Sequence, residues 1–187
     1  MIKKLARTML LLAGITLPAL AAPILSITPS TNNVLVGQTF SLFLNVSSAV
    51  DLFGWQVDLD YGPAGLLNAL TITEGGFFGG GTSGITGTIN NGTAAILAMA
   101  NSLTGFTGVS GSGVLAQIFF TAATVGTATV SISNVQLLDS NLDSIFPGSP
   151  LSATVNITGN NTAVPEPSTF VLLGLGLTFG AAIRRRV

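Results

Sequence analysis

Apolar and polar residues alternate along several short segments of this 187-residue chain. Every second side chain is apolar in residues 39–46, where Phe43 interrupts the pattern, and in residues 55–61. Such alternation is typical of a β-strand that buries one face. Five further segments read as strands: 66–73, 94–100, 114–122, 126–138 and 153–157.

Two of these segments are largely apolar: 94–100 is apolar throughout, and 114–122 is apolar except for Gln117 and Thr121. A continuous apolar run indicates a strand that is covered on both faces. Glycine and serine concentrate between the strands, and the longest loops are predicted at 75–87 and 101–113.

No helical periodicity appears between residues 22 and 163. Many short strands separated by turn residues favour an all-β sandwich over an α/β fold. We therefore expect one β-sandwich domain over residues 22–157, followed by a polar linker at 158–163.

The N-terminus has the pattern of a secretory signal. Three basic side chains within the first seven residues precede an apolar run at 9–17, which Pro18 ends. Ala19 and Ala21 supply a small-x-small cleavage site, so we expect a signal helix in residues 1–21 to reach the Sec translocon and to be removed. A retained N-terminal anchor is the alternative.

A second targeting pattern ends the chain. Pro165, Glu166 and Pro167 should be extended, because each proline fixes φ and removes a backbone donor. The apolar run 170–183 is shorter than the roughly 20 residues of a full membrane span. Three basic residues close the run: Arg184, Arg185 and Arg186. By the positive-inside rule they should stay in the cytoplasm, which places the preceding domain outside.

Residues 164–187, with their tripeptide, apolar run and arginine cluster, resemble a PEP-CTERM sorting signal. The resemblance implies an exosortase-type processing enzyme in a Gram-negative bacterium. It also implies a C-terminal hydrophobic helix that anchors the chain transiently in the inner membrane. An anchor that is never cut is the alternative.

All six basic residues lie in the two terminal patterns, whereas residues 22–163 carry six acidic and no basic side chains. Internal salt bridges are therefore impossible there, and nucleic-acid binding is disfavoured because nothing neutralises phosphate groups. The chain has no histidine and no cysteine, which removes disulfides, thiolate nucleophiles and histidine-based catalytic sets. This composition argues against an enzyme.

Asp58 and Asp60 are two residues apart on one predicted strand, so their side chains share a face. They could form a carboxylate pair for glycoside hydrolysis, a calcium site, or simply a solvated polar face. Asp139 and Asp143 faintly resemble a calcium loop, but the favoured interpretation is a turn stabilised by Asp and Asn side chains. The sequence predicts no cofactor, and calcium is the only metal for which it offers candidate ligands.

Aromatic residues offer two kinds of candidate contact. Trp55 and Tyr61 share a strand face that could stack on sugar rings, yet their alternation with polar residues predicts a core face. Phe77 and Phe78 lie in a glycine-rich loop, where they could make exposed ligand contacts or form a hydrophobic plug.

The order of five segments resembles a cohesin domain: 36–40, 51–61, 73–77, 111–116 and 134–139. The resemblance implies a jelly-roll β-sandwich of about nine strands that is related to carbohydrate-binding modules. Cohesins have no catalytic residues and bind dockerin modules through one sheet face. Gly54 departs from the polar residues that dockerin binders carry on the strand holding Gly54 and Gln56.

We therefore expect an exported, non-catalytic binding or structural protein of the cell envelope or the exopolysaccharide matrix. Its partner would be a dockerin-like protein; a carbohydrate-binding module that acts on polysaccharide is the alternative. The candidate ligand contacts are Gln56, Asp58, Asp60, Phe77 and Phe78.

Overall fold

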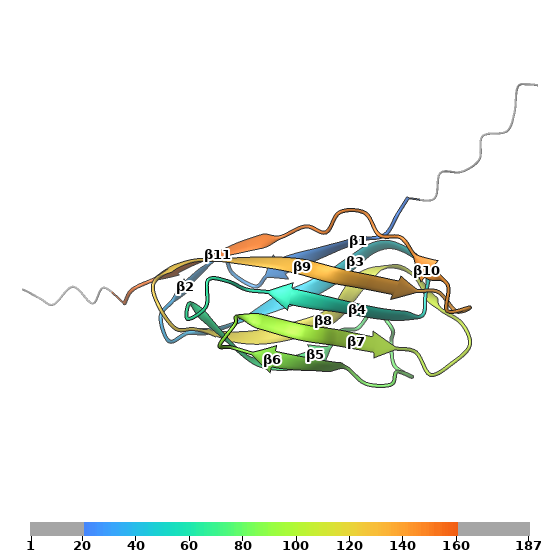
Figure 1. The fold of residues 1–187 in the computed structure, drawn as a ribbon, viewed down its shortest axis with the longest axis horizontal. Helices are drawn as coiled ribbons and strands as arrows, with labels where there is room; N and C mark the ends of the chain where they lie inside the picture. The colour runs from blue at the N-terminus through green and yellow to red at the C-terminus, as the bar shows by residue number, and fades with distance from the viewer. Residues whose placement is uncertain (1–20, 161–187) are drawn as a thin grey trace, which may run out of the picture.

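The computed structural model describes residues 21–160, which form two β-sheets packed face to face (Figure 1). The predicted terminal helices lie outside these residues, and no helix occurs within them. The strands are β1 (Ile24–Pro29), β2 (Asn33–Leu35), β3 (Thr39–Leu52), β4 (Gly54–Asp60), β5 (Leu67–Glu74), β6 (Thr86–Asn90), β7 (Ala95–Ser102), β8 (Val109–Ala122), β9 (Gly126–Leu138), β10 (Ser144–Ile145) and β11 (Ala153–Thr158). The predicted all-β sandwich is confirmed.

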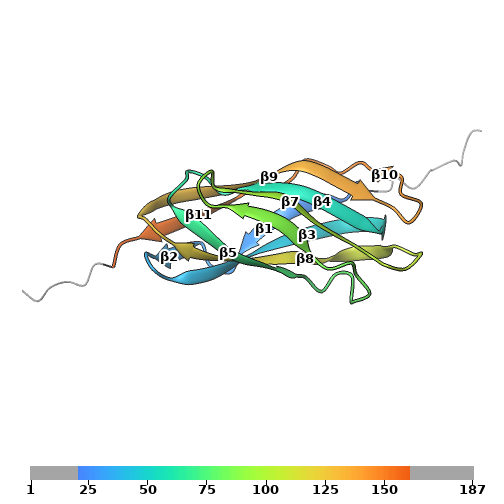
Figure 2. The ribbon, with the colours of Figure 1, turned by 60° about the horizontal axis from the view of Figure 1, so that its bottom comes forward.

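The smaller sheet has the order β1-β3-β8-β5, and the larger has the order β2-β11-β9-β4-β7-β6, with β10 added beside β9. Neighbouring strands are antiparallel except for β2 and β11. Figure 2 shows the two sheets as separate layers. The chain enters β1 at one end of the sandwich and leaves β11 at the other (Figure 1).

The core lies between the sheets and follows the alternation in the sequence. Phe40, Leu42 and Leu44 of β3 point inward and are at most 6% exposed. The Phe120 ring of β8 stacks on Phe40 at 5.9 Å between centroids and meets the Tyr61 ring edge-on at 5.0 Å. Each such side chain contributes roughly 1.5–3 kcal/mol through burial. The core therefore stabilises the domain without disulfides or ion pairs.

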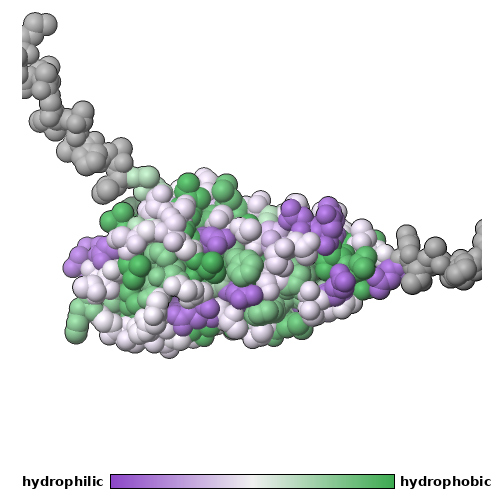
Figure 3. Space-filling model, turned by 180° about the vertical axis from the view of Figure 1, so that it is seen from behind, coloured by the Kyte–Doolittle hydropathy of each residue, from purple (hydrophilic) through white to green (hydrophobic). Residues whose placement is uncertain are grey.

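The expectation that 94–100 and 114–122 are covered on both faces is wrong. Leu97 of β7 is 45% exposed, and the outward residues of β8 are only half-buried. A two-layer sandwich has no third layer to cover its outer faces. On the face of the molecule seen in Figure 3, apolar and polar residues are interspersed.

The loop predicted at 101–113 is shorter in the structure, because β7 continues to Ser102 and β8 already begins at Val109. Gly111 pairs with Ala49, and Gly113 pairs with Val46, across a bulged part of the β3–β8 ladder. Glycine therefore marks a bulge in this segment, where the sequence suggested a loop.

Candidate binding face

The outer face of the β9-β4-β7-β6 part of the larger sheet carries polar side chains, of which Asp58 and Asp60 on β4 are charged. Side chains alternate along β4, so Gly54, Gln56 and Asp58 lie on the outer face while Trp55 and Val57 lie on the core face. The strand register then decides which residues surround them.

Gln56 lies at the centre of this face. It is paired with Ala100 on β7 and with Gln136 on β9. Two residues earlier on β4 and on the same face, Gly54 is paired with Ser102 and Leu138.

Two adjoining hollows mark the face. The first has a volume of about 210 Å³ and surrounds Gly54, and the second has a volume of about 590 Å³ and lies beside Asp58 and Leu97. Gln56 and Gln136 line both hollows, so together these form one groove across β9, β4 and β7.

Asp58 connects three strands of the groove. Its Oδ1 accepts a hydrogen bond from the backbone N–H of Ala98 on β7 at 2.7 Å, and its Oδ2 accepts one from the side-chain amide of Asn134 on β9. Ala98 and Asn134 both have a φ of 49°, in the left-handed region that non-glycine residues rarely adopt. One carboxylate thus stabilises an unusual backbone conformation on each side of β4.

The strand register shows that Ala98 and Asn134 both lie at irregularities in strand pairing. Between the pairs Val57–Met99 and Leu59–Ile96, β7 contains one residue more than β4. On the other side, β9 has an extra residue where Asp58 pairs with Ser133. Each extra residue is a β-bulge, which bends the strand and increases its twist. The two bulges shape the groove around Asp58.

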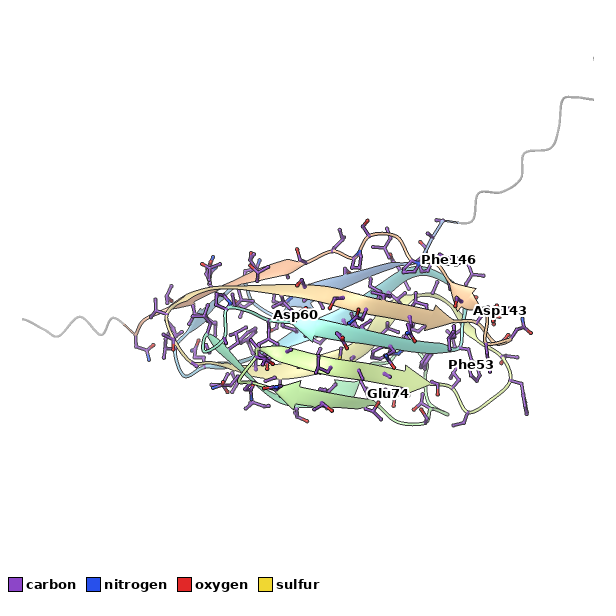
Figure 4. The ribbon with its side chains drawn as sticks, in the orientation of Figure 1. Phe53, Asp60, Glu74, Asp143 and Phe146 are labelled. Atoms are coloured by element: carbon purple, nitrogen blue, oxygen red, sulfur yellow. The ribbon has the colours of Figure 1, made fainter. Side chains whose placement is uncertain are left out.

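The Asn134 side-chain amide holds the pKa of Asp58 below its ordinary value, and the Ala98 N–H adds to this effect while partial burial opposes it. Asp60 is exposed and accepts a hydrogen bond from the Ser133 hydroxyl at 3.2 Å. The carboxylates of Asp58 and Asp60 therefore accept hydrogen bonds from different neighbours and have no hydrogen-bond partner in common. In Figure 4, Asp60 lies far from Glu74 and Asp143. Within residues 21–160, no three acidic side chains converge on one point.

Phe77 and Phe78 do not make exposed contacts on this face. Phe78 is 7% exposed and belongs to the core, and its ring lies 5.6 Å from that of Phe77. The Phe77 N–H donates to the carbonyl of Val114 on β8, which keeps the loop against the smaller sheet. The burial of Phe78 agrees with the hydrophobic plug and leaves almost none of its side chain for a ligand, whereas Phe77 is only partly buried and its ligand contact stays a prediction. Trp55 and Tyr61 are buried as expected.

Two other aspartates stabilise loops. The Asp139 Oδ1 accepts hydrogen bonds from the N–H groups of Asn141 and Asp143 at 2.8 and 2.9 Å, which is the turn considered for this segment. Asp51 accepts hydrogen bonds from Ser140 and from the Gly108 N–H. The Ser140 hydroxyl is the main reason that the pKa of Asp51 is lowered.

The predicted processing residues fall largely outside the described part of the chain, and Ala21 is exposed at its beginning. Those outside it are Ala19, Pro165, Glu166, Pro167, Arg184, Arg185 and Arg186. In the described part of the chain, no helix is long and apolar enough to cross a membrane. The apolar segment 170–183 lies beyond that part.

Sequence reasoning identified Gln56 and Asp58 but missed Asn134, Gln136 and Asn101. Asn101 is a polar residue at 4% exposure inside β7, directly opposite Trp55. In the sequence, its amide directly follows the apolar run 94–100. Asn134 and Gln136 belong to segment 134–139, which carries part of the cohesin resemblance, but only the register of β9 places them beside β4.

Comparison with known families and structures agrees with this architecture. The cohesin domain profile matches residues 25–162, and the PEP-CTERM protein-sorting motif matches residues 163–186. No curated protein matches the chain.

Three solved structures illustrate the similarity. The second type II cohesin module from the adaptor scaffoldin of Acetivibrio cellulolyticus has a TM-score of 0.64 at 16% identity, covering 80% of this chain and 98% of that one. The non-cellulosomal cohesin from the archaeon Archaeoglobus fulgidus has a TM-score of 0.61 at 13% identity, with coverages of 76% and 96%. A type I cohesin–dockerin complex from Clostridium thermocellum contains a chain with a TM-score of 0.59 at 12% identity, with coverages of 74% and 95%.

At these identities the structural likeness shows the fold alone, whereas the cohesin profile spans most of the sequence. The PEP-CTERM match begins where the cohesin match ends. The chain therefore belongs to the cohesin domain family and carries a PEP-CTERM sorting motif at its C-terminus.

Proposed function

We propose that this protein is an exported, non-catalytic interaction module whose partner protein docks on the outer face of β9, β4, β7 and β6. The groove across Gln56 and Gln136 is the observation that carries the proposal. Its amides and hydroxyls offer both donors and acceptors, which suits hydrogen bonding to a folded partner.

Charge narrows the chemistry of the partner. Residues 22–163 carry six acidic and no basic side chains, so their field attracts cationic surfaces and repels anionic ones. We infer a partner with lysine or arginine at the rim of its interface. Solved relatives include cohesins in complex with dockerins, which supports a dockerin-like module as the first partner to test. Because Gly54 has no side chain, β4 offers a partner fewer side-chain hydrogen bonds than it would with a polar residue at each outward position.

The terminal segments are the basis for the proposed cellular location. We propose that residues 1–21 direct export through the Sec translocon and that an exosortase-type enzyme processes residues 164–187. In this scheme the apolar segment 170–183 anchors the chain transiently in the inner membrane of a Gram-negative cell, with residues 22–157 outside. A place in the envelope or the exopolysaccharide matrix follows from that route. The motif at 163–186 supports this scheme.

A charge-insertion variant tests the docking face. Gln56→Arg places a long cationic side chain in the centre of the groove, where it should repel a basic partner. Thr121→Arg is the matched control, because Thr121 is half-buried on β8 of the other sheet. The full chain should retain a partner from the extracellular fraction, Thr121→Arg should retain the same one, and Gln56→Arg should lose it. Equal retention by both variants would contradict the assignment of the face.

A further inference from the structure

A third hollow continues the groove beyond β9. It has a volume of about 340 Å³ and lies where β10 pairs with the end of β9. Gln136 lines this hollow as well as the two that surround Gly54 and Asp58. The hollowed surface therefore continues from the docking face onto β10 and the residues that follow it.

The strand register places Phe146 on the same face as Gln136. Ile145 of β10 is paired with Leu137 of β9. Leu137 is 1% exposed and Ile145 packs against the core, so both side chains point inward. Side chains alternate along an extended chain, so Phe146, the next residue, points outward. Its place beside Gln136 in the lining of the third hollow agrees with this orientation.

The Phe146 side chain is 84% exposed, although its backbone is held in place. On one side, Ile145 is paired with β9. On the other side, the Gly148 N–H donates to the Pro23 carbonyl at 2.9 Å, and Pro147 between them has a fixed φ. An aromatic ring on a held backbone loses little conformational entropy when a partner covers it, which favours its use in binding.

The surroundings of the third hollow define the chemistry that fits it. Besides Gln136 and Ser144, the residues that line it are apolar: Val135, Leu137, Leu138, Ile145, Phe146 and Pro147. Asp143 is exposed in the turn before β10 and lies with Phe146 at the end of the sandwich where β9 finishes (Figure 4). Since residues 22–163 contain no basic side chain, the rim attracts cations.

We propose that Phe146 is a hot-spot residue of the docking face, and that the partner protein places an apolar side chain flanked by lysine or arginine in the hollow beside it. This inference rests on the proposed function and adds to it the chemistry of one partner side chain. Aromatic residues dominate the affinity of many protein interfaces because they bury a large apolar area. In this arrangement Gln56 and Gln136 orient the partner through hydrogen bonds, and Phe146 supplies apolar contact.

Photo-crosslinking with benzoylphenylalanine tests the position of Phe146. The full chain carrying this amino acid at position 146, 56 or 106 is irradiated in the extracellular fraction of cells that produce the protein, and the adducts are analysed by mass spectrometry. We expect positions 146 and 56 to capture the same protein, and position 146 to bond to it beside a lysine or arginine. Phe106 is the matched control, because it is 96% exposed in the β7–β8 loop and lines none of the three hollows.

The other outcomes separate this inference from the proposed function. Capture at position 56 without capture at position 146 would overturn the role of Phe146 and leave the docking face intact. No capture at position 56 would contradict the docking face itself, and the role of Phe146 with it. An adduct of twice the mass of the chain at position 146 would place a second copy there and overturn the assignment, as would equal capture at position 106.

Calorimetry with the captured protein, produced recombinantly, measures the contribution of the ring. Phe146→Ala should weaken binding about thirtyfold, and Phe146→Leu should restore part of the affinity. Phe106→Ala should bind like the wild type. Because both phenylalanines are largely exposed, all three variants should keep the wild-type melting temperature. If Phe146→Ala binds as tightly as the wild type, Phe146 is not a hot-spot residue.

Discussion

Asn91 joins the two sheets at one edge of the sandwich, and its removal should destabilise the domain strongly. It follows β6 in the larger sheet, and its Oδ1 accepts hydrogen bonds from the Tyr61 hydroxyl and from the N–H of Ala69, each at 2.7 Å. Its Nδ2 donates to the Ala69 carbonyl at 3.1 Å, on β5 of the smaller sheet. Asn91→Ala removes all three bonds at once.

The magnitude follows from these contacts. Three hydrogen bonds at about 0.5–1.5 kcal/mol each give a loss of roughly 2–4 kcal/mol. The Tyr61 hydroxyl belongs to a side chain that is 0% exposed, so leaving it unpaired adds to the loss. Tyr61→Phe alone removes one bond and should cost about 1 kcal/mol. The coupling between the two substitutions in a double-mutant cycle should be about 1 kcal/mol.

Urea unfolding followed by the emission of Trp55 measures these differences, because this single tryptophan is buried and becomes exposed on unfolding. Asn91→Asp is a matched comparison, because it keeps both acceptor contacts of Oδ1 but sets an oxygen, in place of the Nδ2 donor, against the Ala69 carbonyl. It too should be less stable than the wild type. If Asn91→Ala unfolds at the wild-type urea midpoint, the bridge between the sheets contributes nothing and the reasoning is refuted.

Three further predictions use other contacts. The pKa of Asp58 is lowered in the folded state, so the stabilisation that its carboxylate gives is present above its ordinary pKa of 3.8. This stabilisation is lost as the pH falls through the folded value. Between about pH 6 and about pH 3, the urea midpoint should therefore decrease less in Asp58→Asn than in the wild type. Gly108→Ala should cost about 1–3 kcal/mol, because its Cβ would lie 2.4 Å from the Asp51 carbonyl group, whereas the neighbouring Gly105→Ala meets nothing within 4 Å and should be neutral in the same assay. Replacing residues 165–167 with alanines should leave uncut precursor in the membrane fraction, seen by mass spectrometry of both termini, and normal-sized released protein would contradict the sorting role.

The period of two in the sequence was sufficient to identify most strands and the residues on the core side of β3 and β4. Alternation is a local property of an extended chain, so it survives whatever the strand pairs with. The same holds for the terminal signals, whose meaning depends on the order of charges, prolines and apolar runs. Composition alone also excluded internal ion pairs and histidine-based catalysis.

The composition of the candidate face depended on tertiary structure. Gln56 and Asp58 were recognisable on their own strand, but Gln136 and Asn134 lie about 80 residues away and reach them only through the register of β9. Two bulges shift that register by one residue on each side of β4, and a single residue decides which face a side chain occupies. The burial of Phe77 and Phe78 likewise depends on how their loop folds back on β8. Local pattern thus determined which residues face the core, whereas the neighbours of each outward residue were decided by pairing between distant strands.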